Sequence, residues 1–132
     1  MRIRYEVICG SAGSMAISIA CGGDRTSTSP TPTPSNPTSP TTITISSNAV
    51  SPKAIIVPPG SRVTFVNNDT VTHDMDSDPH PERTDCPEIN QVSFLAPGQS
   101  RQTGNLNTSR TCGYHDHERE TVQALRGTMT VQ

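Results

Sequence analysis

The sequence predicts an all-β domain, an antiparallel β-sandwich of about seven short strands over residues 42–132. Short segments alternate polar and apolar residues, which is the period of a half-buried strand. Turn-forming residues, mainly Pro, Gly and Asn, separate these segments at short intervals. No segment has a helical period, although Glu118–Leu125 has room for one turn. Short strands with frequent turns favour a sandwich or barrel over any helical fold.

The expected strands, in chain order, are Thr42–Ser46, Lys53–Val57, Arg62–Asn67, Val92–Leu95, Arg101–Leu106, Arg110–Tyr114 and Gly127–Val131. The third strand places Val63 and Phe65 on one face, because side chains two residues apart point the same way in a strand. Pro58-Pro59-Gly60 and Pro97-Gly98 interrupt the chain between strands. Asn48–Pro52 is expected to be a turn.

Asp74–Glu88 is an acidic, proline-rich segment, and we expect it to be a solvated loop. Asp74, Asp76 and Asp78 alternate as in a calcium-binding loop, but the glycine and the late glutamate of an EF-hand are missing. The negative charge of this loop would attract a basic partner protein.

Residues 1–21 are predicted to be an export signal. Arg2 and Arg4 provide a positive start, a modestly apolar stretch follows, and small residues surround Cys21. This arrangement is typical of a bacterial lipoprotein signal, so we expect Cys21 to be lipidated; the alternatives are a plain secretory signal and a misassigned start. Residues 22–41 are rich in Ser, Thr and Pro, which predicts a disordered linker before the domain at residues 42–132.

Charge and hydropathy exclude some partners. The formal net charge is −2, whereas a nucleic-acid-binding protein needs a basic face. No apolar run is long enough for a transmembrane helix, so contact with a membrane is expected only through a lipid on Cys21. We expect an exported monomer in the periplasm or on the outer cell surface.

The candidate metal site lies near the end of the chain. Cys112 and His115 have the spacing C-x-x-H, and His117 follows two residues later. A thiolate and an imidazole from one tight loop can bind the same ion, and these ligands suit copper, zinc or iron rather than a hard cation. With one more histidine, they would form the His₂Cys set of a blue-copper site.

Five segments, in this order, resemble the cupredoxins, the copper β-sandwich family that includes plastocyanin and pseudoazurin. They are V-P-P-G-S-R-V-T-F-V-N-N-D (57–69), His73, A-P-G-Q-S (96–100), C-G-Y-H (112–115) and G-T-M-T-V (127–131). The resemblance implies a Greek-key sandwich, one copper ion and single-electron transfer. It also implies that His73, Cys112 and His115 are the equatorial copper ligands.

The chain departs from the family at the axial position. Leu125 stands where a cupredoxin commonly has its weak methionine ligand. The axial ligand would then be absent, a backbone oxygen, or a side chain such as His117 or Met75. The segment Asp116–Arg126 is also longer and more charged than in the family, so a redox partner would dock differently.

The cysteine count offers an alternative to a copper thiolate. Once the cysteines at or before residue 21 are set aside, Cys86 and Cys112 remain. Two cysteines in an oxidising compartment commonly form a disulfide, and a bonded Cys112 would have no thiolate for copper. A structural zinc site with Cys86, Cys112, His115 and His117 is a weaker alternative, because the spacings match no zinc-finger pattern.

Three functions remain open from the sequence. The first is a copper protein of the cell envelope that transfers single electrons to a partner protein. The second is a copper carrier or chaperone whose exposed ligands are among His73, Met75, His80, His115 and His117. The third is a metal-free module with a Cys86–Cys112 disulfide. We do not expect an enzyme, because G-x-S-x-G is absent and a Cys–His pair this close cannot serve as nucleophile and base.

Overall fold

A computed structural model describes residues 40–132. The predicted signal at residues 1–21, the lipidation site Cys21 and the linker up to residue 39 lie outside the described residues, so these remain predictions. No helix within residues 40–132 is long and apolar enough to cross a membrane.

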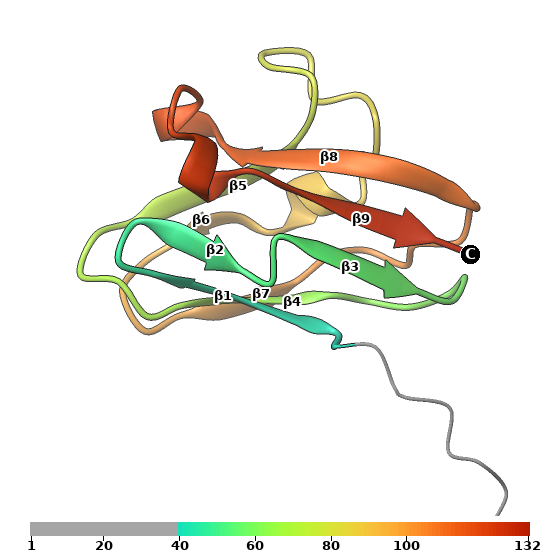
Figure 1. The fold of residues 1–132 in the computed structure, drawn as a ribbon, viewed down its shortest axis with the longest axis horizontal. Coiled ribbons are helices and arrows are strands. Elements are labelled where there is room, and N and C mark those ends of the chain that lie inside the picture. The colour runs from blue at the N-terminus through green and yellow to red at the C-terminus, as the bar shows by residue number, and fades with distance from the viewer. Residues whose placement is uncertain (1–39) are drawn as a thin grey trace, which may run out of the picture. The chain divides into compact units, whose positions relative to one another are not determined.

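The described residues form two β-sheets (Figure 1). The four-stranded sheet has the order β2 (Ala49–Ser51), β1 (Thr42–Ser46), β4 (Thr64–Asn67) and β7 (Ser100–Gln102). The five-stranded sheet has the order β3 (Ala54–Val57), β9 (Gly127–Val131), β8 (Arg110–Asp116), β5 (His73–Ser77) and β6 (Ser93–Leu95). Three short 3₁₀ helices complete the fold: η1 (Ile89–Gln91), η2 (His117–Arg119) and η3 (Gln123–Leu125).

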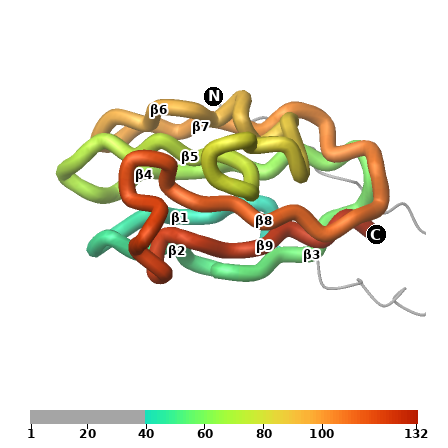
Figure 2. The backbone as a smooth tube through the Cα atoms, turned by 90° about the horizontal axis from the view of Figure 1, so that it is seen from above, coloured from blue at the N-terminus to red at the C-terminus, as the bar shows by residue number. Residues whose placement is uncertain are grey.

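The core lies between the two sheets. Apolar side chains at alternate strand positions face inward, among them Ile43, Phe65 and Met129. The ring of Phe65 in β4 contacts the ring of Tyr114 in β8 edge to face, with a centroid distance of 5.3 Å, so these two sheets pack against each other. In Figure 2 the strand orders of the two sheets run the same way, with β6 and β7 at one edge and β3 and β2 at the other. The predicted all-β sandwich is confirmed.

The pairing of the strands differs from the prediction in one respect, because both sheets are mixed. β1 pairs with β4 in parallel, and β3 pairs with β9 in parallel. The reason is a change of sheet at Pro52-Lys53: β2 pairs with β1, while the next strand pairs with β9 in the other sheet. The segment expected to be a turn at Asn48–Pro52 therefore contains the short strand β2.

Two further differences concern the strands that carry the candidate site. β5 occupies the start of the segment expected to be a solvated loop, and all five of its residues are buried. β8 continues to Asp116, two residues beyond the expected end at Tyr114. β5 pairs with the end of β8, with Met75 opposite Asp116 and Asp76 opposite His115.

Candidate metal site

The two faces of β8 separate the predicted ligands. Tyr114 points inward to Phe65, so Cys112 and Asp116, each two residues away, also point inward. His115 lies on the opposite, outer face. Cys112 and His115 are three residues apart in an extended strand, and such residues cannot turn toward one ion.

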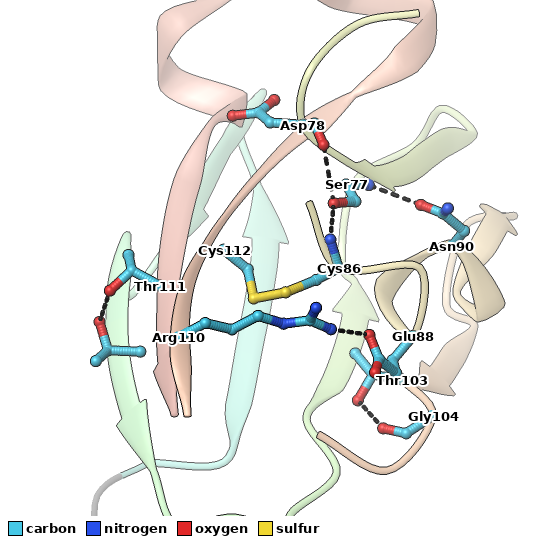
Figure 3. The surroundings of a disulfide bond; sticks show 11 residues. Ser77, Asp78, Cys86, Glu88, Asn90, Thr103, Gly104, Arg110, Thr111 and Cys112 are labelled. Carbon is cyan, nitrogen blue, oxygen red and sulfur yellow. Dashed lines mark hydrogen bonds and ion pairs between the residues drawn. A yellow bond between two sulfur atoms is a disulfide. The ribbon is translucent and has the colours of Figure 1, made fainter. Parts of the chain in front are cut away.

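Cys112 is bonded to Cys86 in a disulfide (Figure 3). The two Cα atoms are 5.8 Å apart, within the usual range for a disulfide. The backbone N–H of Cys86 donates to Oγ of Ser77 at 2.8 Å, which holds the loop against the end of β5. As a result, Cys112 has no thiolate for a metal.

His73 is fully buried, and both of its ring nitrogens are partnered by carboxylates. Nδ1 lies 2.6 Å from Oδ2 of Asp116, and Nε2 lies 3.1 Å from Oδ2 of Asp69. Arg119 adds an ion pair to the same Asp116 oxygen at 3.2 Å. The pKa of Asp69 is lowered, chiefly by the hydrogen bond from the Asn48 N–H and also by His73. Both ring nitrogens of His73 are therefore occupied by carboxylates and not directed at a metal site.

A second group of histidines lies on the outer face of β8. His80, His115 and His117 each offer a ring nitrogen, and these three atoms lie within 4.8 Å of one another. We call them the histidine cluster. The ring centroids of His80 and His117 are 4.5 Å apart, and those of His80 and His115 are 5.4 Å apart. The Nδ1 atoms of His80 and His117 are joined by a hydrogen bond of 3.1 Å. His115 is buried, His117 is half-buried and His80 is exposed, so the cluster opens to solvent on one side.

Asp78 orients the buried member of the cluster. Its Oδ1 lies 2.6 Å from Nδ1 of His115, and Arg126 pairs with the same oxygen at 3.4 Å. The backbone N–H of Asp78 donates to the carbonyl of Gly113 at 3.0 Å. A Cβ atom on Gly113 would collide with the Asp78 carboxylate, so the glycine leaves space for it.

This arrangement leaves one ring nitrogen ready for a metal. Nε2 of His115 is buried and has no hydrogen-bond partner. When Nδ1–H donates to Asp78, Nε2 carries the lone pair, which is the carboxylate–histidine–metal arrangement found at many metal sites. Three imidazole nitrogens suit copper, zinc or nickel. The histidine cluster therefore fits a transition-metal ion.

Comparison with known proteins identifies the fold. No family model and no curated protein matches the chain. Among solved structures, a purple cupredoxin from Nitrosopumilus maritimus is 19% identical with a TM-score of 0.52, over 69% of this chain and 98% of that one. The chain has the cupredoxin fold. Plastocyanin from Dryopteris crassirhizoma, in its oxidised form, is also 19% identical, with a TM-score of 0.54 over 69% of this chain and 99% of its own.

A larger protein contains the same fold. A copper-containing nitrite reductase from Thermus scotoductus matches 70% of this chain at 20% identity and a TM-score of 0.54, but only 22% of the reductase is covered. At these levels of identity the likeness concerns the cupredoxin fold alone. The residues of this chain must therefore decide which ligands are available.

The ligand set predicted from the sequence needs correction. His73, Cys112 and His115 do not come together, because Cys112 is in the disulfide and His73 is held by two carboxylates. Leu125, at the expected axial position, is fully buried in the core. His115 and His117 do lie together, and the third member is His80, which the sequence placed in a solvated loop and named only among the possible ligands of a copper carrier. Its only signal is its position between two prolines in D-P-H-P, which does not distinguish a ligand from a loop residue.

Proposed function

We propose that this cupredoxin-fold protein binds one copper ion through the histidine cluster and acts as an exported copper carrier of the cell envelope. The observation that supports this most strongly is the buried, unpartnered Nε2 of His115, whose ring is oriented by Asp78 and lies beside two further imidazoles. A buried polar atom without a partner costs free energy, and a bound cation would offset that cost.

The donor set supports copper. Among divalent first-row metals, copper binds most tightly to a given set of nitrogen ligands. With no thiolate in the set, the protein would lack the intense blue colour of a copper–thiolate site. When bound, the ion would supply a redox-active centre, while His115 and Asp78 would fix its position on β8.

The partial exposure of the histidine cluster suits a protein that carries copper and passes it to a partner. His80 is exposed and lies in the loop after β5, whereas His115 is anchored in a strand. A partner protein can reach the ion from the side of His80 and replace that ligand first. No catalytic step is needed, so we propose a carrier and not an enzyme.

Single-electron transfer through the same ion is the second candidate. It is favoured by the cupredoxin fold, whose paired strands would limit movement of His115 between Cu(I) and Cu(II). It would require a redox partner that docks over the exposed edge of the cluster.

The test is a titration of the purified full-length protein with Cu(II), followed by calorimetry and electron paramagnetic resonance. We expect one Cu(II) per chain, nitrogen couplings in the resonance spectrum and no strong thiolate-to-copper absorption band. His115→Ala should weaken binding at least about 100-fold. Unchanged affinity in that variant would refute the site.

The two candidates then separate by measurement. Rapid transfer of the ion to a competing chelator, with slow electron exchange at an electrode, supports a carrier. Fast, reversible electron exchange with retention of the ion supports electron transfer. Absence of copper binding would leave the metal-free module.

A further inference from the structure

Four buried side-chain polar atoms in residues 40–132 have no hydrogen-bond partner. They are Oδ1 of Asp74, Oδ1 and Oδ2 of Asp76, and Nε2 of His115. Buried polar atoms are nearly always partnered, and exceptions commonly mark an ion or a water. All four belong to β5 and β8, two neighbouring strands of one sheet.

The strand register places Asp76 beside His115. The two residues are directly opposite each other in the antiparallel pair. Side chains at directly opposed positions lie on the same face with their Cβ atoms about 5 Å apart. The outer face that carries His115 therefore also carries the Asp76 carboxylate, which is 1% exposed. In the metal-free protein this carboxylate faces Arg83, and among residues 40–132 only the three histidine nitrogens lie within 4.8 Å of one another.

Arg83 provides the counter-charge for Asp76. Its Nη1 lies 2.9 Å from Oδ2 of Asp76, yet neither carboxylate oxygen accepts a well-aligned hydrogen bond. Arg83 comes from the loop after β5, which also carries His80; Figure 1 shows this loop, in yellow, above β8. The Arg83 side chain is 37% exposed, so its guanidinium can turn into solvent without crossing the core.

We propose that Asp76 is a fourth ligand of the ion held by the histidine cluster, and that Arg83 competes with the ion for this carboxylate. This inference rests on the proposed function. Arg83 neutralises Asp76 in the metal-free protein and turns outward when a divalent cation takes its place. An anionic oxygen among three imidazoles is a hard ligand, so the site prefers Cu(II) or Zn(II) to Cu(I).

The proposal predicts opposite effects for the two partners of one ion pair. In the full-length protein, Asp76→Asn should weaken Cu(II) and Zn(II) binding about 10- to 100-fold, because the amide carries no charge. Arg83→Gln should tighten binding several-fold, because the competing cation is gone. Asp74→Asn is the matched control from the same strand and face, and it should change the affinity far less than Asp76→Asn.

Binding is measured by calorimetry with Cu(II) or Zn(II) alone and by the metal-induced rise in melting temperature. The resonance spectrum of bound Cu(II) should also change in Asp76→Asn. Equal affinity in Asp76→Asn and the parent protein would overturn the proposal, and so would weaker binding in Arg83→Gln. If Asp76→Asn does not fold, the sign of the Arg83→Gln effect decides.

The His115→Ala variant distinguishes loss of the fourth ligand from loss of the whole histidine cluster. Lost binding in His115→Ala together with unchanged binding in Asp76→Asn would remove only the fourth ligand. Unchanged binding in both variants would remove the histidine cluster as a metal site.

Discussion

His73 and His115 are fully buried in the same sheet, and each has Nδ1 at 2.6 Å from an aspartate oxygen. They differ at the other ring nitrogen. Nε2 of His73 meets Asp69 at 3.1 Å, whereas Nε2 of His115 has no hydrogen-bond partner. Burial alone therefore does not distinguish a structural histidine from a metal ligand. The partner of the second nitrogen does.

The difference follows from the faces of the sheet. His73 points inward with Asp116, at the end of β8, and Arg119 closes an ion-pair network around them. His115 points outward, where the loop after β5 brings His80 over it. Around His73 ion pairs hold neighbouring elements together, whereas in the histidine cluster Nε2 of His115 has no partner and could bind a cation.

The largest predicted effect concerns the disulfide, which links the loop carrying His80 to the strand carrying His115. Replacing Cys86 and Cys112 together by Ser should lower the free energy of unfolding by about 3.5 kcal/mol, because the unfolded chain regains the freedom of the loop between them. Urea denaturation measures this loss.

The same variant tests whether the loop positions His80. We expect weaker Cu(II) binding at temperatures where the variant is still folded, since the loop is no longer tied to β8. Full retention of both stability and affinity would contradict the assigned role of the disulfide.

The second prediction concerns the ion-pair network around His73. His73→Ala should lower the free energy of unfolding by about 3 kcal/mol, because it leaves a buried Asp116 with only Arg119 as its charged partner. Copper affinity should change by less than about two-fold, since His73 makes no contact with the histidine cluster. Loss of copper binding in the folded variant would show that His73 is a ligand after all.

The alternation of polar and apolar residues in the sequence predicts those strands whose buried side chains are apolar. Ile43 and Ile45 in β1, and Met129 and Val131 in β9, are buried at every second position. β5 was missed because Asp74 and Asp76, which read as solvated from the sequence, are buried in it. Elements from elsewhere in the chain bury these side chains, and such burial cannot be inferred from the local sequence.

The candidate site was only partly predictable for a similar reason. The C-x-x-H spacing draws attention to Cys112 and His115, but whether they face one ion depends on where the strand ends. Pairing with β5 extends β8 to Asp116, and this places the two residues on opposite faces. The alternative disulfide, inferred from the cysteine count, agrees with the bond between Cys86 and Cys112.

The third prediction sharpens the role of Asp78. Gly113→Ala should push the Asp78 carboxylate away from His115, because the new methyl group would occupy its place. Metal affinity should fall about 10-fold, as at other sites that lose the carboxylate orienting a histidine ligand. Thr111→Ala, an exposed position on the same face of β8, is the matched control. Equal affinities in the two variants would show that Asp78 does not orient His115.

The smallest effect should come from Asp74, whose buried carboxylate lies on the outer face. Burial, and then repulsion from Asp76, raises the pKa of Asp74 above its ordinary value of 3.8. The folded protein therefore holds this proton to a higher pH than the unfolded chain does. The stability that this proton contributes is present in full below pH 3.8 and is lost as the pH rises through the folded-state pKa.

Asp74→Asn cannot lose this proton. As the pH rises from 3.8 toward neutrality, the metal-free parent loses this contribution and the Asp74→Asn variant does not. The free energy of unfolding of the variant should therefore increase relative to that of the parent. Parallel urea titrations of both proteins over this range measure the difference. A constant difference would mean that Asp74 has the same pKa in the folded and unfolded chains, and burial on the outer face would then have no electrostatic cost.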